Sequence, residues 1–293
     1  MTRTILPSLI PLADGPLPGV LLADESRHAS GSHKEPSARA VVERARTAGH
    51  THVVVGSCGS YGRAMAVACA AAGLRCTVVI PQGWGDGGEF AAAAGAVVHE
   101  VPGGYEDAVA ESSRLAETTG AADGNVNGPY KDTVLEGHGH VVDALHDALD
   151  GEPASLWVPV GNGTTVVAAH RRARDLGWPL AVHGVCSAGN NPVATSWPGP
   201  YRPLRGDEVT TTEHNEPLVN WHALHGPDAL VSIADSHGAV HSVSDADLVD
   251  AQAFLARRGV RASASGAAGL AGLLAHAAST PVAGPQVVLL TGR

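Results

Sequence analysis

Short apolar runs rich in β-branched residues alternate with Ala-rich segments along most of this chain, starting near residue 52. The apolar runs predict strands at residues 52–56, 76–81, 97–101, 156–160, 180–186 and 286–290. The segments between them predict helices at 61–73, 89–95, 105–120, 135–149, 161–177, 266–278 and, with Ser244 as its N-cap, 245–258. Repeated units of strand, glycine turn and helix predict an α/β fold, with parallel sheets covered by helices. Residues 192–238 follow neither period and predict loops that cover a site.

The composition is that of a globular chain, with 44% hydrophobic and 16% charged residues. A formal net charge of −10 speaks against nucleic acid as a partner, because no basic patch is large enough to drive counterion release. No apolar run approaches the roughly 20 residues of a membrane span, and the N-terminal residues lack a signal-peptide core. The four cysteines show no CxxC spacing and are expected to be free thiols in a reducing compartment, so we expect a cytoplasmic protein.

Lysine occurs at only two positions, 34 and 131. Lys34 follows residues 31–33 (GSH) and precedes a predicted strand that ends in a glycine-rich loop. A lysine amine bonds reversibly to an aldehyde cofactor and can then move protons as a general base and acid. A preference for arginine codons would explain the scarcity of lysine, but it would not explain these neighbours. Lys34 is therefore the candidate catalytic residue.

Residues 56–62 (GSCGSYG) lie between a predicted strand and a predicted helix. Their spacing is GxxGxxG, and the next strand ends without an acid to hold a ribose, which disfavours a nicotinamide site. Backbone N–H groups and hydroxyls at a helix N-terminus suit a small carboxylate. The candidate substrate-binding residues are therefore Ser57, Cys58, Gly59, Ser60 and Tyr61, with a plain strand-to-helix turn as the alternative.

Residues 160–165 (VGNGTT) again join a predicted strand to a predicted helix. Glycines let the backbone approach a ligand, and a helix N-terminus favours a dianion. The lysine of a nucleotide-binding P-loop is missing, so a phosphate monoester fits better. Gly161, Asn162, Gly163, Thr164 and Thr165 are therefore candidates for phosphate binding, and an ordinary turn is the alternative.

Residues 289–292 (LLTG) close the last predicted strand. The carboxyl ends of strands line the ligand crevice of open α/β sheets, where the Thr291 hydroxyl would meet a heteroaromatic nitrogen. Elsewhere, His138 and His140 form an HxH pair, but the spacing places no third ligand and HExxH is absent. Polar residues at a helix start explain this pair better, and no metal site is predicted.

Taken together, these stretches resemble the fold type II pyridoxal-phosphate enzymes of the tryptophan synthase beta-like superfamily, and threonine synthase most closely. The resemblance covers most of the chain in consistent order and rests on residues 24–34, 57–60, 127–131, 136–138, 158–163, 265–268 and 290–292. Residues 265–268 (SGAA) also resemble the serine and threonine dehydratases. The chain departs from the family pattern at His33, Glu35, Pro36, Ser60 and Ser263.

The resemblance implies two lobes, each a mostly parallel sheet flanked by helices, with a small lobe at residues 45–142 and a large lobe at 1–44 and 143–293. It implies pyridoxal 5′-phosphate held by Lys34, with Ser60, residues 161–165 and Thr291 around it. It also implies a homodimer. A neutral Thr291 at the ring nitrogen makes the ring a weaker electron sink, which favours elimination or replacement over transamination. Lys131 is the candidate cation for a leaving phosphate, and a solvated loop lysine is the equal alternative.

We therefore expect a lyase resembling threonine synthase that acts on a small, activated amino acid such as an O-phosphorylated one. A serine/threonine dehydratase-like or β-replacement enzyme is the first alternative, and release of ammonia in place of phosphate would distinguish it. A homologue that binds the cofactor without turnover is the second, because His33, Ser60 and Ser263 depart from the family. A nicotinamide enzyme is the third, and tight binding of NAD would support it.

Overall fold

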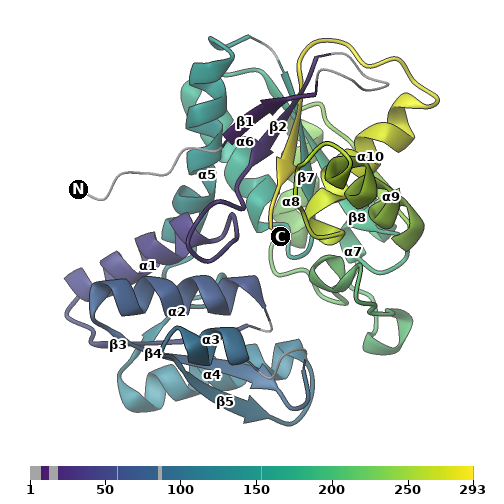
Figure 1. Cartoon of the computed structure of the whole chain (residues 1–293). Helices are drawn as coiled ribbons and strands as arrows, with labels where there is room; N and C mark the ends of the chain where they lie inside the picture. The colour runs from purple at the N-terminus through teal and green to yellow at the C-terminus, as the bar shows by residue number, and fades with distance from the viewer. Residues whose placement is uncertain (1–7, 13–18, 58, 85–87, 153, 293) are drawn as a thin grey trace. The chain divides into compact units, whose positions relative to one another are not determined.

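The computed structural model describes residues 8–12, 19–57, 59–84, 88–152 and 154–292. The chain groups into two compact units, the first made of residues 1–27 and 139–293 and the second of residues 28–138. Each unit has its own sheet (Figure 1). Each unit also has its own hydrophobic core. The lobe boundaries expected from the sequence, 45–142 for the small lobe, stay a prediction.

The second unit is built on a parallel sheet whose strands are β3 (His52–Gly56), β4 (Arg75–Pro81), β5 (Val97–Val101) and β6 (Ala122–Asp123), in the order β5-β4-β3-β6. Its helices include α1 (Glu35–Thr47), α2 (Ser60–Ala72), α3 (Glu89–Ala93) and α4 (Tyr105–Thr119). Side chains alternate between the two faces of a strand. Val53 and Val55 therefore pack with residues of α1 and α2, whereas Val54 and Val79 pack with residues of α4. Both faces of this sheet are thus covered, which explains its continuous apolar strands.

The first unit contains a six-stranded sheet in the order β1-β2-β10-β7-β8-β9. β1 pairs antiparallel with β2, and the remaining pairings are parallel. The strands are β1 (Ser8–Pro11), β2 (Val20–Asp24), β7 (Ala154–Pro159), β8 (Leu180–Ser187), β9 (Val240–Val243) and β10 (Gln286–Leu290). The helices are α6 (Thr164–Leu176), α7 (Pro192–Ser196), α8 (Gly226–Asp235), α9 (Asp245–Ala256) and α10 (Ala268–Ala277), with short 3-10 turns η1 (Gly206–Glu208), η2 (Glu216–Leu218) and η3 (Ser265–Ala267). The boundary between the units falls within α5 (Lys131–Ala148).

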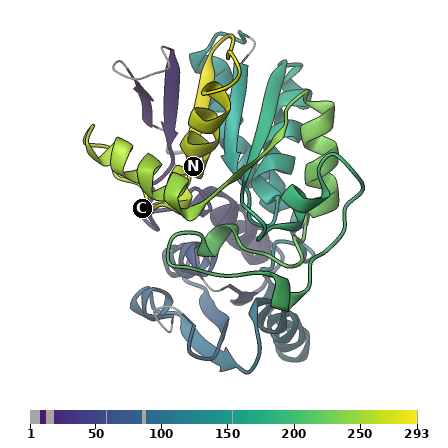
Figure 2. The same ribbon diagram turned by 90° about the vertical axis from the view of Figure 1, so that its right-hand side faces the viewer.

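Two neighbouring residues of β8 show which helices cover each face of the six-stranded sheet. A Cβ atom on Gly184 would lie 2.9 Å from Ile233 of α8, whereas a Cβ atom on Gly272 of α10 would lie 2.6 Å from Val185. Because consecutive strand residues face opposite sides, α8 and α10 cover opposite faces (Figure 2). Because β7 and β10 are parallel, their carboxyl ends lie at the same end of the sheet. Open α/β sheets bind ligands outside the carboxyl ends of their strands.

The predicted α/β class is confirmed, and the strands predicted at 52–56, 97–101 and 286–290 are β3, β5 and β10 with unchanged bounds. Ser244 caps α9 as expected, because its side chain accepts a hydrogen bond from the Asp247 N–H. Residues 192–238 are more regular than predicted, since they contain α7 and α8. These helices are short and α8 begins at a Gly-Pro pair, so the polar stretches around them hide their periodicity.

Among the described residues, no helix combines the length and the apolar content that a bilayer span requires.

Candidate functional site

The loop between β7 and α6, residues 160–165, is named the Gly161 loop below, and it is held through its carbonyl oxygens. Asn191, which is fully buried, donates from Nδ2 to the carbonyls of Val160 and Gly161 at 3.1 and 3.0 Å. The Asn162 carbonyl accepts the His225 N–H at 2.9 Å. In a trans peptide the N–H points opposite to the C=O. Holding the carbonyls of Val160, Gly161 and Asn162 therefore points the N–H groups of the same three peptide units, which belong to residues 161–163, away from these contacts.

The Gly161 loop leads into α6 through a glycine N-cap. Gly163 occupies this position with φ 83°, and it offers no side chain to accept the first N–H groups of the helix. Those groups have no carbonyl partner within the helix, and they carry the positive end of its dipole. Thr164 and Thr165 are buried beside them, and the Thr164 hydroxyl lies 3.0 Å from His225 Nδ1. This donor set suits a phosphate group.

Close packing explains both glycines of the Gly161 loop. A Cβ atom on Gly161 would overlap the Pro217 carbonyl oxygen, and one on Gly163 would lie 2.8 Å from Cβ of Ala229. Gly163 also has a positive φ that L side chains rarely adopt. The backbone is therefore fixed, and a bound anion would meet main-chain N–H groups without moving side chains. The residues present fit the phosphate of pyridoxal phosphate.

Thr291 directly follows β10 in the same unit, and the structure brings it together with the 265–268 segment. The Thr291 N–H donates to the Gly266 carbonyl at 3.4 Å, and a Cβ atom on Gly266 would lie 2.5 Å from the Gly292 carbonyl oxygen. Ser263 bonds to both segments. Its N–H donates to the Gly292 carbonyl at 3.0 Å, and its hydroxyl accepts the Gly266 N–H at 3.1 Å. Ser263, one of the departures from the family pattern, thus fixes the backbone that precedes α10.

The loop between β3 and α2, residues 56–61, is named the Ser57 loop, and its side chains make several contacts within the second unit. The buried Ser57 hydroxyl accepts the N–H of Gly62 at 2.9 Å and of Gly59 at 3.5 Å. The Tyr61 hydroxyl donates to the Gly124 carbonyl at 3.0 Å, and burial raises the pKa of Tyr61. Gly59 is exposed and Ser60 half-buried, whereas Cys58 lies outside the described residues. A ligand could therefore reach this loop at Gly59 and Ser60.

The three glycines of the GxxGxxG pattern differ in their surroundings. A Cβ atom on Gly56 would lie 2.6 Å from Val109 Cα of α4, and one on Gly62 would lie 2.9 Å from Val78. A Cβ atom on Gly59 would have no heavy atom of the described structure within 4 Å, its chain neighbours aside. Gly56 and Gly62 are therefore packing glycines, and the middle one alone adjoins open space.

Lys34 is half-buried at the N-cap of α1, in the second unit. Its N–H donates to Ser32 Oγ at 3.3 Å, and its carbonyl accepts the Ala38 N–H at 3.0 Å. The buried Glu35 accepts the Ser30 N–H at 2.6 Å, which closes the turn around the lysine. These bonds fix the main chain from which the Lys34 side chain departs.

The structure brings the Lys34 segment together with residues 136–138. A Cβ atom on Gly137 would overlap Ser37 of α1, and the rings of His33 and His138 lie 5.3 Å apart. Lys131, the other lysine, is exposed at the first position of α5. The two residues of the HxH pair have different partners, because His140 Nε2 lies 2.8 Å from Glu25 Oε2 in the first unit.

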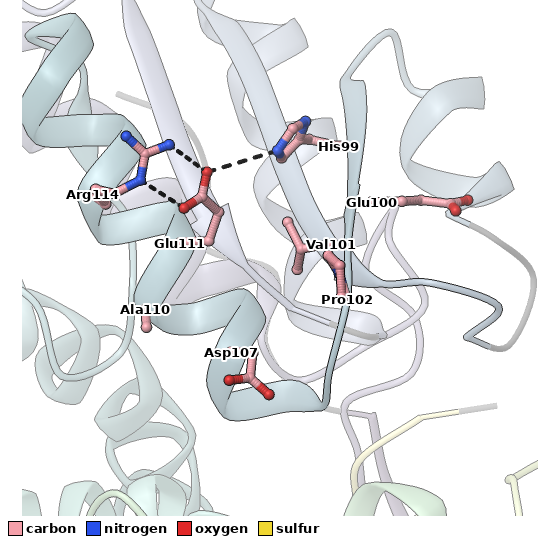
Figure 3. Close-up of a pocket in the computed structure, with 8 residues that line it drawn as sticks. All are labelled: His99, Glu100, Val101, Pro102, Asp107, Ala110, Glu111 and Arg114. Atoms are coloured by element: carbon pink, nitrogen blue, oxygen red, sulfur yellow. Dashed lines mark hydrogen bonds and ion pairs between the residues drawn. The ribbon is translucent and has the colours of Figure 1, made fainter.

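A surface pocket of about 590 Å³ opens on the second unit between β5 and α4 (Figure 3). Its charged groups are largely paired, since Arg114 donates to both Glu111 oxygens at 2.6 and 2.7 Å and His99 lies 3.8 Å from Glu111. None of the predicted site residues within the described ranges lines this pocket. We therefore do not assign the cofactor or the substrate to it.

Sequence reasoning missed the residues that hold the two loops. Asn191 holds the Gly161 loop, His225 meets it from the start of α8, and Asn125 Oδ1 accepts the Gly56 N–H at 2.9 Å. An available signal was the Asn191-Pro192 pair, which is typical of an N-cap followed by the first helical residue. That signal locates α7 but not the loop that Asn191 binds.

A comparison with known proteins supports the same interpretation. Residues 3–292 match the family of pyridoxal-phosphate dependent enzymes, PALP. A threonine synthase from Synechocystis sp. is 28% identical over 277 residues, which cover 90% of this chain and 68% of that relative. A threonine synthase from Bacillus sp. is 25% identical, covering 92% of this chain and 76% of the relative.

Solved structures share the fold at lower identity. Diaminopropionate ammonia lyase from Escherichia coli, solved with a PLP intermediate, has a TM-score of 0.83 at 15% identity. The matched region covers 100% of this chain and 85% of the lyase chain. L-serine ammonia-lyase from Rhizomucor miehei has a TM-score of 0.76 at 19% identity, covering 94% and 88%. At these identities the likeness shows the fold, which is that of fold type II enzymes.

The family match covers both units, including the Gly161 loop and Lys34. It establishes pyridoxal phosphate as the cofactor. Together with the threonine synthase relatives, it supports a pyridoxal-phosphate dependent lyase. This chain therefore belongs to the PALP family of pyridoxal-phosphate dependent enzymes.

Proposed function

We propose that this enzyme catalyses elimination or replacement on a small, activated amino acid, as a threonine synthase does, with an O-phosphorylated amino acid as the first candidate. The Gly161 loop carries the proposal, because its held carbonyls and glycine N-cap present N–H donors suited to a cofactor phosphate. The threonine synthase relatives, at 25–28% identity, support the reaction class.

When bound, the cofactor supplies an aldehyde and an electron-withdrawing ring. In this proposal Lys34 Nζ would hold the aldehyde carbon until the substrate amine replaces it there, and the released Lys34 amine would then take and return the proton at the substrate α-carbon. Thr291 would offer a neutral hydroxyl to the ring nitrogen, so the ring would draw electrons less strongly than beside a carboxylate. That favours reactions in which negative charge leaves with a departing group.

The Ser57 loop is the proposed site for the substrate carboxylate. Gly59 and Ser60 stand at the N-terminus of α2, where N–H groups and the helix dipole attract a single negative charge. Ser60 is also the proposed neighbour of the cofactor ring. Lys131 is the proposed cation for a leaving phosphate, because it is exposed at the start of α5.

The reaction is tested with purified protein, added pyridoxal phosphate, O-phosphorylated serine, threonine and homoserine, and the unphosphorylated forms. We expect inorganic phosphate and an amino-acid product in equal amounts from one of the phosphorylated substrates. Ammonia from an unphosphorylated substrate would replace the proposal with a dehydratase. A yellow protein that releases neither would replace it with a cofactor-binding homologue that lacks turnover.

The role of Lys34 is tested separately from the choice of substrate. Lys34→Ala should abolish the visible absorbance of lysine-bound cofactor and all product formation, because no other amine replaces it. Lys131→Ala is the matched control, since it removes the other lysine of the chain and should keep that absorbance while slowing phosphate release. Retained absorbance in Lys34→Ala would overturn the assignment of the lysine.

We also propose a cytoplasmic homodimer. Cys69, Cys76 and Cys186 are free and buried, which supports a reducing compartment. The dimer rests on the family resemblance alone. Light scattering on the holoenzyme would test it, and a single mass of 29.7 kDa at micromolar concentration would contradict it.

A further inference from the structure

Three histidines gather on a buried tryptophan at the α10 face of the first unit's sheet. Trp157 of β7 and His183 of β8 are register partners, and their rings stack 4.3 Å apart at an angle of 7°. His241 of β9 lies 5.3 Å from His183, and His276 in the last turn of α10 lies 5.2 Å from His241. The tryptophan is buried and the three histidines are half-buried. None of these residues belongs to the proposed cofactor site.

The two strand histidines face each other through their ring nitrogens. His183 Nδ1 and His241 Nε2 are hydrogen-bonded at 3.1 Å, so a metal ion would take the place of the shared proton, which would move to the other nitrogen of its ring. Two nitrogens bound tetrahedrally to one zinc ion at about 2.0–2.1 Å are separated by about 3.3 Å. β8 and β9 are hydrogen-bonded neighbours, so their backbone holds the pair at this separation without a metal.

A third ligand comes from the helix that covers this face. α10 approaches the sheet closely, because a Cβ atom on Gly269 would lie 2.6 Å from the Trp157 carbonyl oxygen. Two turns later the helix carries His276 over the same strands. The His276 ring meets His241 edge-on at 72°, so its nitrogen must turn toward the pair. Because His276 is half-buried near the end of the helix, a rotation about its side-chain bonds can direct it there.

We propose that His183, His241 and His276 bind one divalent transition-metal ion of the zinc or nickel class, with water completing the coordination. Imidazole is the ligand that such ions share, and three imidazoles with an open position are a known zinc arrangement. The ion would link β8 and β9 to α10. It would stabilise the first unit without taking part in the reaction.

The test is a titration of chelator-treated holoenzyme with zinc chloride, followed by calorimetry and by the melting temperature. We expect one ion per chain and a rise in melting temperature. The double variant His183→Ala/His241→Ala should lose this binding, and His276→Ala should weaken it about tenfold. His99→Ala removes an exposed histidine of the second unit and should bind like the parent.

A second measurement guards against a variant that fails to fold. Copper or nickel ions quench a tryptophan that they touch, and Trp157 lies directly against His183. Nickel should therefore quench part of the holoenzyme fluorescence, and Trp157→Phe should remove that part while cofactor absorbance is unchanged. Zinc binding of equal strength in the parent and in the double variant would overturn the proposal. So would the absence of any saturable binding in the parent.

Discussion

The Gly161 loop and the Ser57 loop are each held by a buried asparagine. One asparagine uses the nitrogen of its side-chain amide and the other uses the oxygen. Asn191 donates from Nδ2 to three carbonyls, those of Val160, Gly161 and Leu218. Asn125 accepts the Gly56 N–H through Oδ1. The first contact satisfies acceptors of the Gly161 loop, whereas the second occupies a donor of the Ser57 loop. The difference explains how similar glycine patterns can differ in anion binding.

Side chains at the helix starts extend the contrast. The N-cap of α6 is a glycine, so no N-cap side chain accepts the first N–H groups of that helix. At the start of α2, by contrast, the Ser57 hydroxyl accepts two N–H groups. We therefore expect the Gly161 loop to bind a dianion and the Ser57 loop a singly charged carboxylate. Four substitutions test this comparison, beginning with the largest expected effect.

Gly161→Ala should cause the largest loss of cofactor affinity. The added methyl group would overlap the Pro217 carbonyl oxygen, so the loop must move and its N–H groups lose their common direction. We expect the dissociation constant of pyridoxal phosphate to rise about 100-fold, or about 2.7 kcal/mol. Absorbance titration measures it, with pyridoxal, which lacks the phosphate, as the matched ligand. Equal losses for both ligands would contradict a phosphate-specific role.

Asn191→Ala should weaken the cofactor about tenfold and cost about 1–3 kcal/mol of unfolding free energy, because buried carbonyls lose their donor. Asn190→Ala is the matched control, since its partners, including Ser187, lie outside the Gly161 loop. Denaturant unfolding and the ratio of pyridoxal phosphate to pyridoxal affinity separate the two effects. An unchanged ratio in Asn191→Ala would show that Asn191 supports only the fold.

The sequence predicted the loops correctly but not the residues that hold them. Local patterns, strand then glycines then helix, located residues 56–62 and 160–165, because those patterns depend on near neighbours. Asn191 and Asn125 act on partners about 30 and 69 residues away, and no local period records such a distance. The glycine pattern also could not separate Gly56 from Gly59, because only the packed structure shows that α4 presses on the first and open space adjoins the second.

Ser57→Ala should affect the second unit alone. The N–H groups of Gly59 and Gly62 lose their acceptor, so we expect about 1 kcal/mol of unfolding free energy to be lost. The same change frees donors beside the proposed carboxylate site and should alter KM a few-fold while cofactor affinity stays unchanged. Denaturant unfolding and steady-state kinetics measure these quantities. A loss of cofactor affinity as large as that expected for Gly161→Ala would contradict the assignment of the cofactor phosphate to the Gly161 loop.

Gly59→Ala should have the smallest effect, and it gives the matched counterpart to Gly161→Ala. The backbone at Gly59 has φ −163°, which alanine adopts, and its added methyl group would meet no described heavy atom within 4 Å. The loss of chain entropy in the unfolded state, about 0.4–1 kcal/mol in favour of folding, is offset by the poorer N-cap that alanine makes. We therefore expect unfolding free energy and cofactor affinity to stay near the parent values. We expect the KM for the substrate to rise about threefold, because the methyl group would occupy the open space beside the helix N-terminus where the substrate carboxylate would approach. An unchanged KM would place the substrate carboxylate elsewhere, whereas a loss of cofactor affinity as large as that of Gly161→Ala would show that the Ser57 loop also binds the cofactor phosphate.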